Sequence, residues 1–213
     1  MLLGKQHDKI IEYNEKMKEM KTQLTKEDLL SLEEFTKIRA QKRQETLEIK
    51  KNRRVPLGTE ATLFFENFDT LWWQIQEMLY IEKGGDAQME EELLAYNPLL
   101  PQGQELVATF MIEIDDPIRR AQILGMLGGI EHHLCLRFAG HTLKAIPEED
   151  PNRTTESGKT SAIHFVHWAF TKDQIADFCK VHQDIIVEIT HPSFSSKTLM
   201  AENVRAVLQG DFK

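Results

Sequence analysis

The sequence is poor in cysteine, in net positive charge and in long apolar runs. Its 213 residues include two cysteines, Cys135 and Cys179, too few for a disulfide framework or for the four thiolates of an iron–sulfur cluster. The formal net charge of −8 argues against a general nucleic-acid binder, because neutralising phosphates requires a large positive field. The apolar runs are far shorter than the roughly 20 residues that span a bilayer, and the charged start lacks the apolar region of a signal peptide. We therefore expect a cytoplasmic protein that binds neither nucleic acid nor membrane, with both cysteines as small buried side chains.

Recognised catalytic and cofactor motifs are also missing. There is no GxGxxG fingerprint, no Walker A loop, no HExxH and no GxSxG. Gly125, Gly128 and Gly129 follow a predicted helix, whereas a dinucleotide site needs its glycines where a helix opens. The sequence thus assigns no catalytic residue and no cofactor, and whether the protein is an enzyme stays open.

The N-terminal region is predicted to be helical. Apolar residues recur at spacings of three and four between residues 10 and 24, and nearly all positions between them are polar or charged. Such a narrow apolar stripe suits one partner helix, either from the same chain or from a second copy. We treat residues 1–23 as an N-terminal helical extension through which the protein could form a homo-oligomer.

The remaining residues, 24–213, are predicted to form a single α+β domain. Helical periodicity predicts helices over residues 29–51, 68–82, 86–95, 116–127, 171–182 and 198–208. Alternation and β-branched or aromatic content predict strands over residues 55–57, 62–66, 107–114, 133–138, 142–146, 161–170 and 184–190. Because most strands follow one another through hairpins or short helices, we expect a mainly antiparallel sheet covered by helices on one side.

The densest combination of charged and aromatic side chains follows the first of these helices. Four cations in five residues, including Arg53 and Arg54, precede a strand that ends in Glu66, and the next helix carries Gln74 and Glu77 beside its apolar face. A buried carboxylate has to be hydrogen-bonded or paired with a cation, and the two arginines are the natural partners. One interpretation is a pocket in which these five residues hold a small anionic ligand or a protein partner. The other is an internal ion pair that fixes the helix to the first hairpin.

Eight histidines are present, and two of them could contribute to a metal site. His164 lies in a predicted strand and His191 at the end of another, where its ring could point across the sheet toward His164. Glu188 or Glu113 from neighbouring strands could complete a set of histidine and carboxylate ligands. A metal-dependent enzyme using His164, His191 and a carboxylate is therefore an alternative function. Otherwise these residues are capping or half-buried structural histidines.

Several segments taken together are similar to an uncharacterised bacterial family, one of the domain-of-unknown-function families. The resemblance covers roughly residues 24–212 and rests on Leu24–Glu33, Lys51–Gly58, Thr62–Glu66, Gln74–Leu79 with Glu82, Glu91–Leu99, Lys159–Phe165 and Ile189–Pro192. Genes of this family often stand beside those for rubrerythrin-like proteins and iron–sulfur oxidoreductases. The resemblance therefore implies a cytoplasmic accessory protein in a redox or peroxide-handling setting, with a redox protein as its partner.

Three functions are compatible with these observations. The first is a binding or accessory protein that uses the region of Arg53, Arg54 and Glu77. The second is the metal-dependent enzyme, and the third is an oligomeric scaffold built through residues 1–23.

Overall fold

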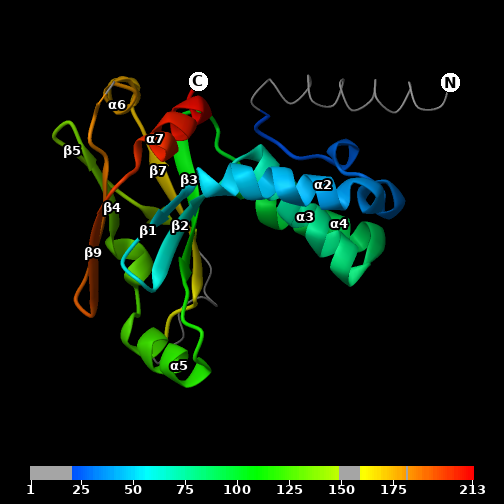
Figure 1. The fold of residues 1–213 in the computed structure, drawn as a ribbon, viewed down its shortest axis with the longest axis horizontal. Coiled ribbons are helices and arrows are strands. Elements are labelled where there is room, and N and C mark those ends of the chain that lie inside the picture. Colours follow the sequence, from blue (N-terminus) through cyan, green and yellow to red (C-terminus); the bar gives the residue numbers. More distant parts are fainter. Residues whose placement is uncertain (1–20, 149–158, 181) are drawn as a thin grey trace.

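The computed structural model describes residues 21–148, 159–180 and 182–213. Within these ranges the fold is α+β, as predicted, and every strand pair is antiparallel. The strands form two sheets, and a group of helices projects away from them to one side (Figure 1). The predicted helical extension over residues 1–23, and with it the predicted oligomer contact, lies almost wholly outside the described residues.

Two sheets are present where the sequence led us to expect one. In the described residues, sheet A has the strand order β1-β2-β3-β7-β6 and sheet B the order β5-β4-β8-β9. The strands of sheet A are β1 (Arg54–Pro56), β2 (Ala61–Phe65), β3 (Glu105–Ile112), β6 (Ile146–Pro147) and β7 (Ile163–Ala169). Those of sheet B are β4 (Leu134–Phe138), β5 (His141–Lys144), β8 (Ile186–His191) and β9 (Phe194–Leu199). The division lets each sheet bury its apolar face against the other.

Alternate residues of sheet A face different layers of the molecule. Leu63 and Phe110 belong to the apolar core that the two sheets share, and both are fully buried. Phe64, Thr109 and Phe165 lie opposite one another on β2, β3 and β7 and face the helices. The same three strands therefore build the sheet-to-sheet core with one face and the floor of the helical region with the other.

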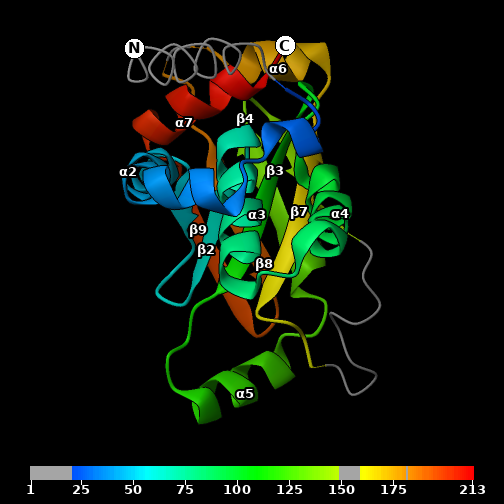
Figure 2. The same ribbon diagram turned by 90° about the vertical axis from the view of Figure 1, so that its right-hand side faces the viewer.

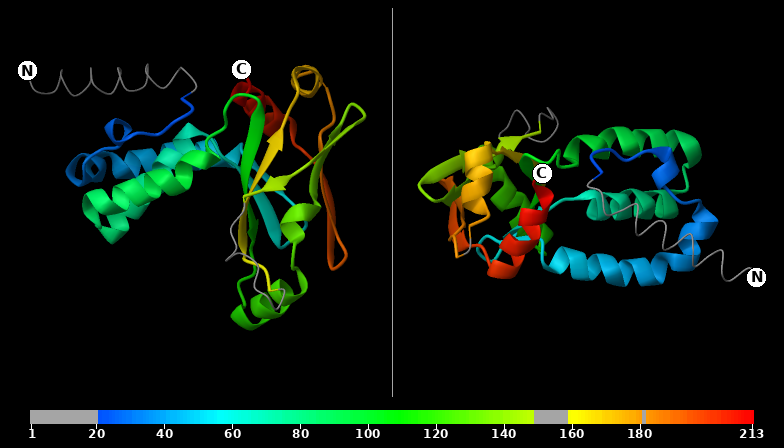
Figure 3. Two further views of the ribbon diagram at one scale, coloured as in Figure 1. Left: turned by 180° about the vertical axis from the view of Figure 1, so that it is seen from behind. Right: turned by 90° about the horizontal axis from the view of Figure 1, so that it is seen from above.

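The helices on this second face form what we call the helical lobe. It contains α2 (Leu32–Lys51), α3 (Phe68–Glu82) and α4 (Gly85–Tyr96), which lie side by side in front of sheet A (Figures 2 and 3). Helix α2 starts where the Ser31 hydroxyl accepts the Glu34 N–H, and α3 starts where the Asn67 side chain accepts the Thr70 N–H. Each cap fixes where its helix begins, and the second sets the position of α3 directly after β2.

The helical lobe has an apolar core of its own. The ring of Phe35, fully buried on α2, lies 6.0 Å from that of Trp72, 5.7 Å from that of Trp73 and 5.9 Å from that of Tyr80. Val107 of β3 is the one fully buried strand residue in this cluster, so the lobe is anchored to sheet A near the start of β3. Aromatic packing between α2 and α3 therefore holds the lobe together away from the sheet.

The remaining helices close the ends of the two-sheet core (Figure 1). They are α5 (Pro117–Met126), α6 (Lys172–Phe178) and α7 (Glu202–Leu208), with the short 3-10 helices η3 (Ile130–His133) and η4 (Gln209–Asp211). Two further 3-10 helices, η1 (Lys26–Asp28) and η2 (Asn97–Leu99), pack with the helical lobe. The helix predicted over 198–208 begins later, because residues up to Leu199 form the edge strand β9. The hydrophobic pattern did not reveal this strand, because it contains the polar residues Ser195, Ser196 and Lys197. Among the described helices, none has both the length and the apolar character needed to cross a bilayer.

Candidate functional site

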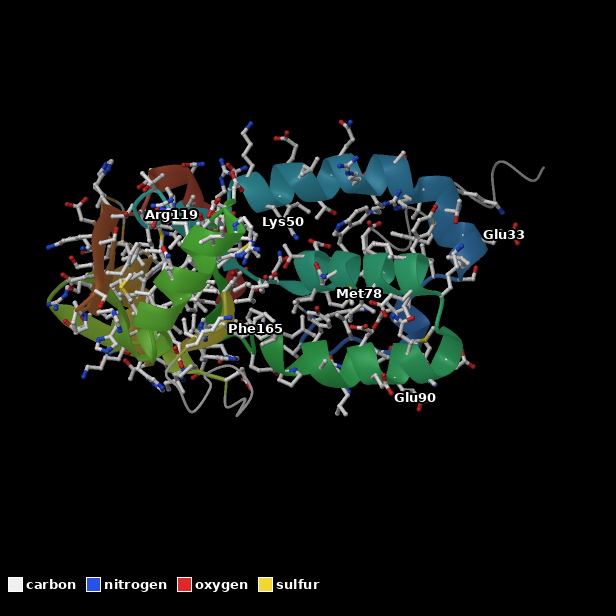
Figure 4. The ribbon with its side chains drawn as sticks, turned by 90° about the horizontal axis from the view of Figure 1, so that it is seen from below. Glu33, Lys50, Met78, Glu90, Arg119 and Phe165 are labelled. Atoms are coloured by element: carbon white, nitrogen blue, oxygen red, sulfur yellow. The ribbon has the colours of Figure 1, made fainter. Side chains whose placement is uncertain are left out.

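A cavity of about 270 Å³ lies where the helical lobe meets sheet A. We call it the helix–sheet cavity. Its floor is the outward face of β2, β3 and β7, and the first turns of α3 and the ends of α2 and α4 surround it, with Lys50 and Phe165 on opposite sides of α3 (Figure 4). The lining residues are Lys50, Phe64, Glu66, Thr70, Leu71, Gln74, Tyr96, Thr109, Met111, Ile163 and Phe165. The cavity thus combines an apolar floor with a few polar side chains, as small-molecule sites do.

Glu66 is the carboxylate of this cavity, and it is held firmly. Only 9% of the residue is exposed. One carboxylate oxygen accepts the Thr70 hydroxyl, and the other accepts the Thr109 hydroxyl at 2.6 Å. The backbone N–H of Glu66 donates to the Val107 carbonyl at 2.8 Å. Both its main chain and its side chain are therefore fixed before any ligand arrives.

Two further polar residues of the cavity have no side-chain partner among the described residues. Gln74, which the sequence singled out, lines the cavity with Glu66 and is half-buried, and its side-chain amide makes no hydrogen bond in the described part of the chain. Lys50, at the end of α2, is half-buried and forms no salt bridge with any described residue. Both side chains are therefore available to a bound molecule.

Arg53 lies outside this cavity and is occupied by other contacts. It is 3% exposed, and its guanidinium donates to the Phe65 carbonyl at 3.0 Å, to the Glu66 carbonyl at 3.1 Å and to the carboxylate of Asp211. Arg54 lies on β1 and is exposed. Neither arginine forms the predicted pair with Glu77. Arg53 instead joins the end of β2 to η4, so its contacts indicate a structural role.

Glu77 pairs with an arginine of α2 that the sequence did not single out. Nε and Nη2 of Arg39 donate to its two oxygens at 2.7 and 2.9 Å, and the guanidinium lies 4.5 Å from the centre of the Tyr80 ring. Glu77 does form an internal ion pair, as one of the two interpretations held, but that pair joins α3 to α2 through Arg39 and does not fix the helix to the first hairpin. Glu77 therefore joins α3 to α2 and does not line the helix–sheet cavity.

His164 is buried between the sheets. It is 1% exposed, its Nε2 lies 2.9 Å from the Thr160 hydroxyl and 3.0 Å from the Ser161 carbonyl, and its Nδ1 lies 3.6 Å from a carboxylate oxygen of Glu131. The order hydroxyl, imidazole, carboxylate is that of a nucleophilic triad. Thr160 is however only 2% exposed, which leaves a substrate no access to the hydroxyl. These contacts describe a buried polar network.

His191 has a different environment. Its Nε2 lies 3.3 Å from the Gly128 carbonyl, its Nδ1 accepts the Ser193 N–H at 3.1 Å, and its ring packs edge-on against that of His133 at 5.0 Å. Among the described residues, no three His, Cys, Asp or Glu side chains come together in a way that could hold a metal ion. The contacts of His164 and His191 therefore give the metal-enzyme alternative no support.

His167 sits between two carboxylates on the helix-facing side of β7. Its Nδ1 lies 3.2 Å from Glu105 and its Nε2 lies 2.8 Å from Glu148. Burial lowers the pKa of the imidazole, but the hydrogen bonds to both carboxylates and their charges outweigh burial, so that the pKa is raised above its usual 6.5. Through these two contacts the ring joins β3 to the segment that follows β6.

A second cavity, of about 440 Å³, lies at the far end of the helical lobe between the start of α2 and the junction of α3 and α4. It is lined mostly by apolar side chains, among them Leu29, Phe35 and Leu79. Its buried amide, Gln76, already accepts the Leu30 N–H at 2.6 Å and donates to the Leu30 carbonyl at 3.4 Å. This cavity is larger, but its charged lining residues, Lys83 and Asp86, are exposed to solvent, whereas Glu66 of the helix–sheet cavity is buried and Lys50 is half-buried.

Sequence reasoning named only Glu66 and Gln74 among the residues that line the helix–sheet cavity, and it missed Thr70, Thr109, Met111 and Phe165 among others. A usable signal existed for Thr109. It is the polar residue within the apolar run of β3, and period-two alternation places it on the face opposite Phe110. Which residues of β2 and β7 lie beside it depends on register, which the sequence alone did not provide.

Comparisons with known proteins agree with this fold. A crystal structure of a protein from Burkholderia pseudomallei, described as a novel protein of unknown function and solved at 1.90 Å, is similar with a TM-score of 0.81 and 34% sequence identity. The similarity covers 89% of this chain and 99% of that one. A search of curated proteins finds no match. The profile of the family described as protein of unknown function (DUF3501) matches residues 23–212, and the chain therefore belongs to this family.

Proposed function

We propose that this protein is a non-catalytic binding protein that holds a small molecule in the helix–sheet cavity. The observation that carries the proposal is the joint presence there of Glu66, fixed by two hydroxyl donors, and of Gln74 and Lys50, which no described residue engages. A pre-formed, partly apolar cavity with a few oriented polar groups is the usual form of a ligand site. The predicted site therefore keeps Glu66 and Gln74, whereas Arg53 supports it from outside through the Glu66 carbonyl.

The setting we propose is the one that the family resemblance implied, an accessory role beside redox proteins in the cytoplasm. With two cysteines in the whole chain, the protein lacks the ligands for an iron–sulfur cluster of its own. Its contribution would be to bind a small molecule or a redox partner. The exposed Arg54 is the member of the predicted site that remains available to a protein partner.

Methyl NMR can test ligand binding directly. Met111 lines the cavity, and Met200 is buried elsewhere, between the sheets, so the two methyl groups serve as probe and internal control. We expect members of a library of small polar fragments to shift the Met111 signal and to leave that of Met200 unchanged.

A variant that fills the cavity provides the second control. Gln74→Trp places an indole in the cavity and should abolish the Met111 shifts, whereas Gln41→Trp makes the same change on the exposed face of α2 and should preserve them. If no fragment shifts Met111, or if the shifts persist in Gln74→Trp, the proposed function is wrong.

A further inference from the structure

Glu66 is a buried carboxylate, and within the described ranges no cation lies at ion-pair distance from it. It is nine-tenths buried on the wall of the helix–sheet cavity, yet it forms no salt bridge with any described residue. Its two partners, the hydroxyls of Thr70 and Thr109, are neutral. The Arg53 guanidinium donates a hydrogen bond to the backbone carbonyl of Glu66, and its ion-pair partner is the carboxylate of Asp211. A buried negative charge is normally matched by a cation, and here the space in front of it is a cavity.

The hydroxyl bonds leave room for such a cation. An ionised carboxylate offers about four acceptor positions, two on each oxygen. Thr70 and Thr109 take one position on each oxygen of Glu66. A ligand ammonium can therefore bind Glu66 without displacing either threonine.

A positive charge also lines the same cavity. Lys50 lines it from the end of α2 and pairs with no described carboxylate, although its neighbour Lys51 does pair, with Glu48. A ligand that carried only an ammonium would be repelled by Lys50, and one that carried only a carboxylate would be repelled by Glu66. A molecule with both groups satisfies both residues.

We propose that the ligand is a small zwitterion of the amino-acid class, with an ammonium at Glu66, a carboxylate at Lys50 and an apolar body over Phe64, Met111 and Phe165. This inference rests on the proposed function and specifies the chemistry of its ligand. The amide of Gln74, which is both donor and acceptor, lies where it can bind either charged group. The class differs from the purely anionic ligand that the arginines had suggested, because Arg53 is engaged by the protein itself.

The test uses three probes that share a phenyl group and differ in charge: L-phenylalanine, 2-phenylethylamine and 3-phenylpropanoate. Their affinities for the full-length protein are measured by titrating the Met111 methyl signal. We expect L-phenylalanine to bind at least tenfold more tightly than either singly charged probe. Glu66→Gln should weaken the two amines and so remove the preference over 3-phenylpropanoate. Lys50→Met should weaken L-phenylalanine and 3-phenylpropanoate but not 2-phenylethylamine, and so remove the preference over the amine. Lys51→Met is the matched control and should change none of the three affinities.

Equal affinities for the three probes, or tightest binding of 3-phenylpropanoate, would overturn the zwitterion assignment. So would fragment binding at Met111 with no response to L-phenylalanine, an outcome that leaves the cavity's binding role intact. Loss of every Met111 response would instead remove the proposed function itself. If Glu66→Gln does not fold, the ranking of the probes on the unmodified protein still decides between these outcomes.

Discussion

The two faces of sheet A are built from the same strands but differ in how completely they are covered. The face toward sheet B is sealed by large apolar side chains such as Leu63 and Phe110, both fully buried. On the opposite face, the helical lobe covers Val107 but leaves Thr109 and Met111 beside a cavity. A sheet can therefore obtain its stability from one face and leave the other incompletely covered. The uncovered part is where polar residues gather and where we place the ligand.

The largest expected effect comes from truncating a buried side chain on the face of sheet A that packs against sheet B. Phe110→Ala should lower the free energy of unfolding by about 4–5 kcal/mol, because Phe110 is fully buried and its removal leaves a void. Phe64→Ala, on the cavity face of the adjacent strand, should cost roughly 1–1.5 kcal/mol, since this residue is half-buried. Urea unfolding followed by tryptophan fluorescence measures both. Equal losses would show that the two faces contribute alike.

The next largest effect concerns the buried contacts of Arg53 at the end of β2. Arg53→Met should cost about 3–4 kcal/mol, because it leaves Asp211 buried without a cation and removes donors from the carbonyls of Phe65 and Glu66. Arg39→Met, which breaks the more exposed pair with Glu77, should be much milder. Thermal unfolding of the two variants side by side tests this. A milder effect of Arg53→Met would mean that the C-terminal contact contributes little.

The smallest effect depends on pH and lies on the cavity face. Because the pKa of His167 is raised in the folded protein, the folded state binds more protons than the unfolded state above pH 6.5. The stabilisation is fully present below that pH and is lost as the pH rises through the folded-state pKa. The difference in unfolding free energy between the unmodified protein and His167→Gln should therefore shrink from pH 6 toward pH 9, as measured by denaturant titrations at fixed ionic strength. A difference that grows with pH would contradict this assignment.

Local sequence patterns predicted those parts of the fold that local physics determines. The α3 helix spans Phe68–Glu82, as predicted, because Asn67 caps it and its apolar residues recur at helical spacing. The predicted alternation of the β7 strand also holds, since His164 and His167 lie on opposite faces. Of the five predicted ligand residues, Glu66 and Gln74 line the same cavity, because the chain turns directly from β2 into α3.

Contacts between distant segments could not be predicted in the same way. Glu77 has Arg39 as its partner, 38 residues earlier, because α2 and α3 run side by side, and no spacing rule distinguishes Arg39 from the other cations of that helix. Arg53 lies 158 residues from Asp211. The strand β9 was missed because edge strands need only one pairing partner and tolerate polar side chains.

The pair formed by Arg53 and Asp211 also constrains the order of events during synthesis. Arg53 leaves the ribosome early, but its guanidinium acquires its counter-ion only after η4 has been translated. Until then the turn between α2 and β1 carries a positive charge that has no partner. We therefore expect the start of sheet A to reach its final structure late on a nascent chain, after the helical lobe has had time to form.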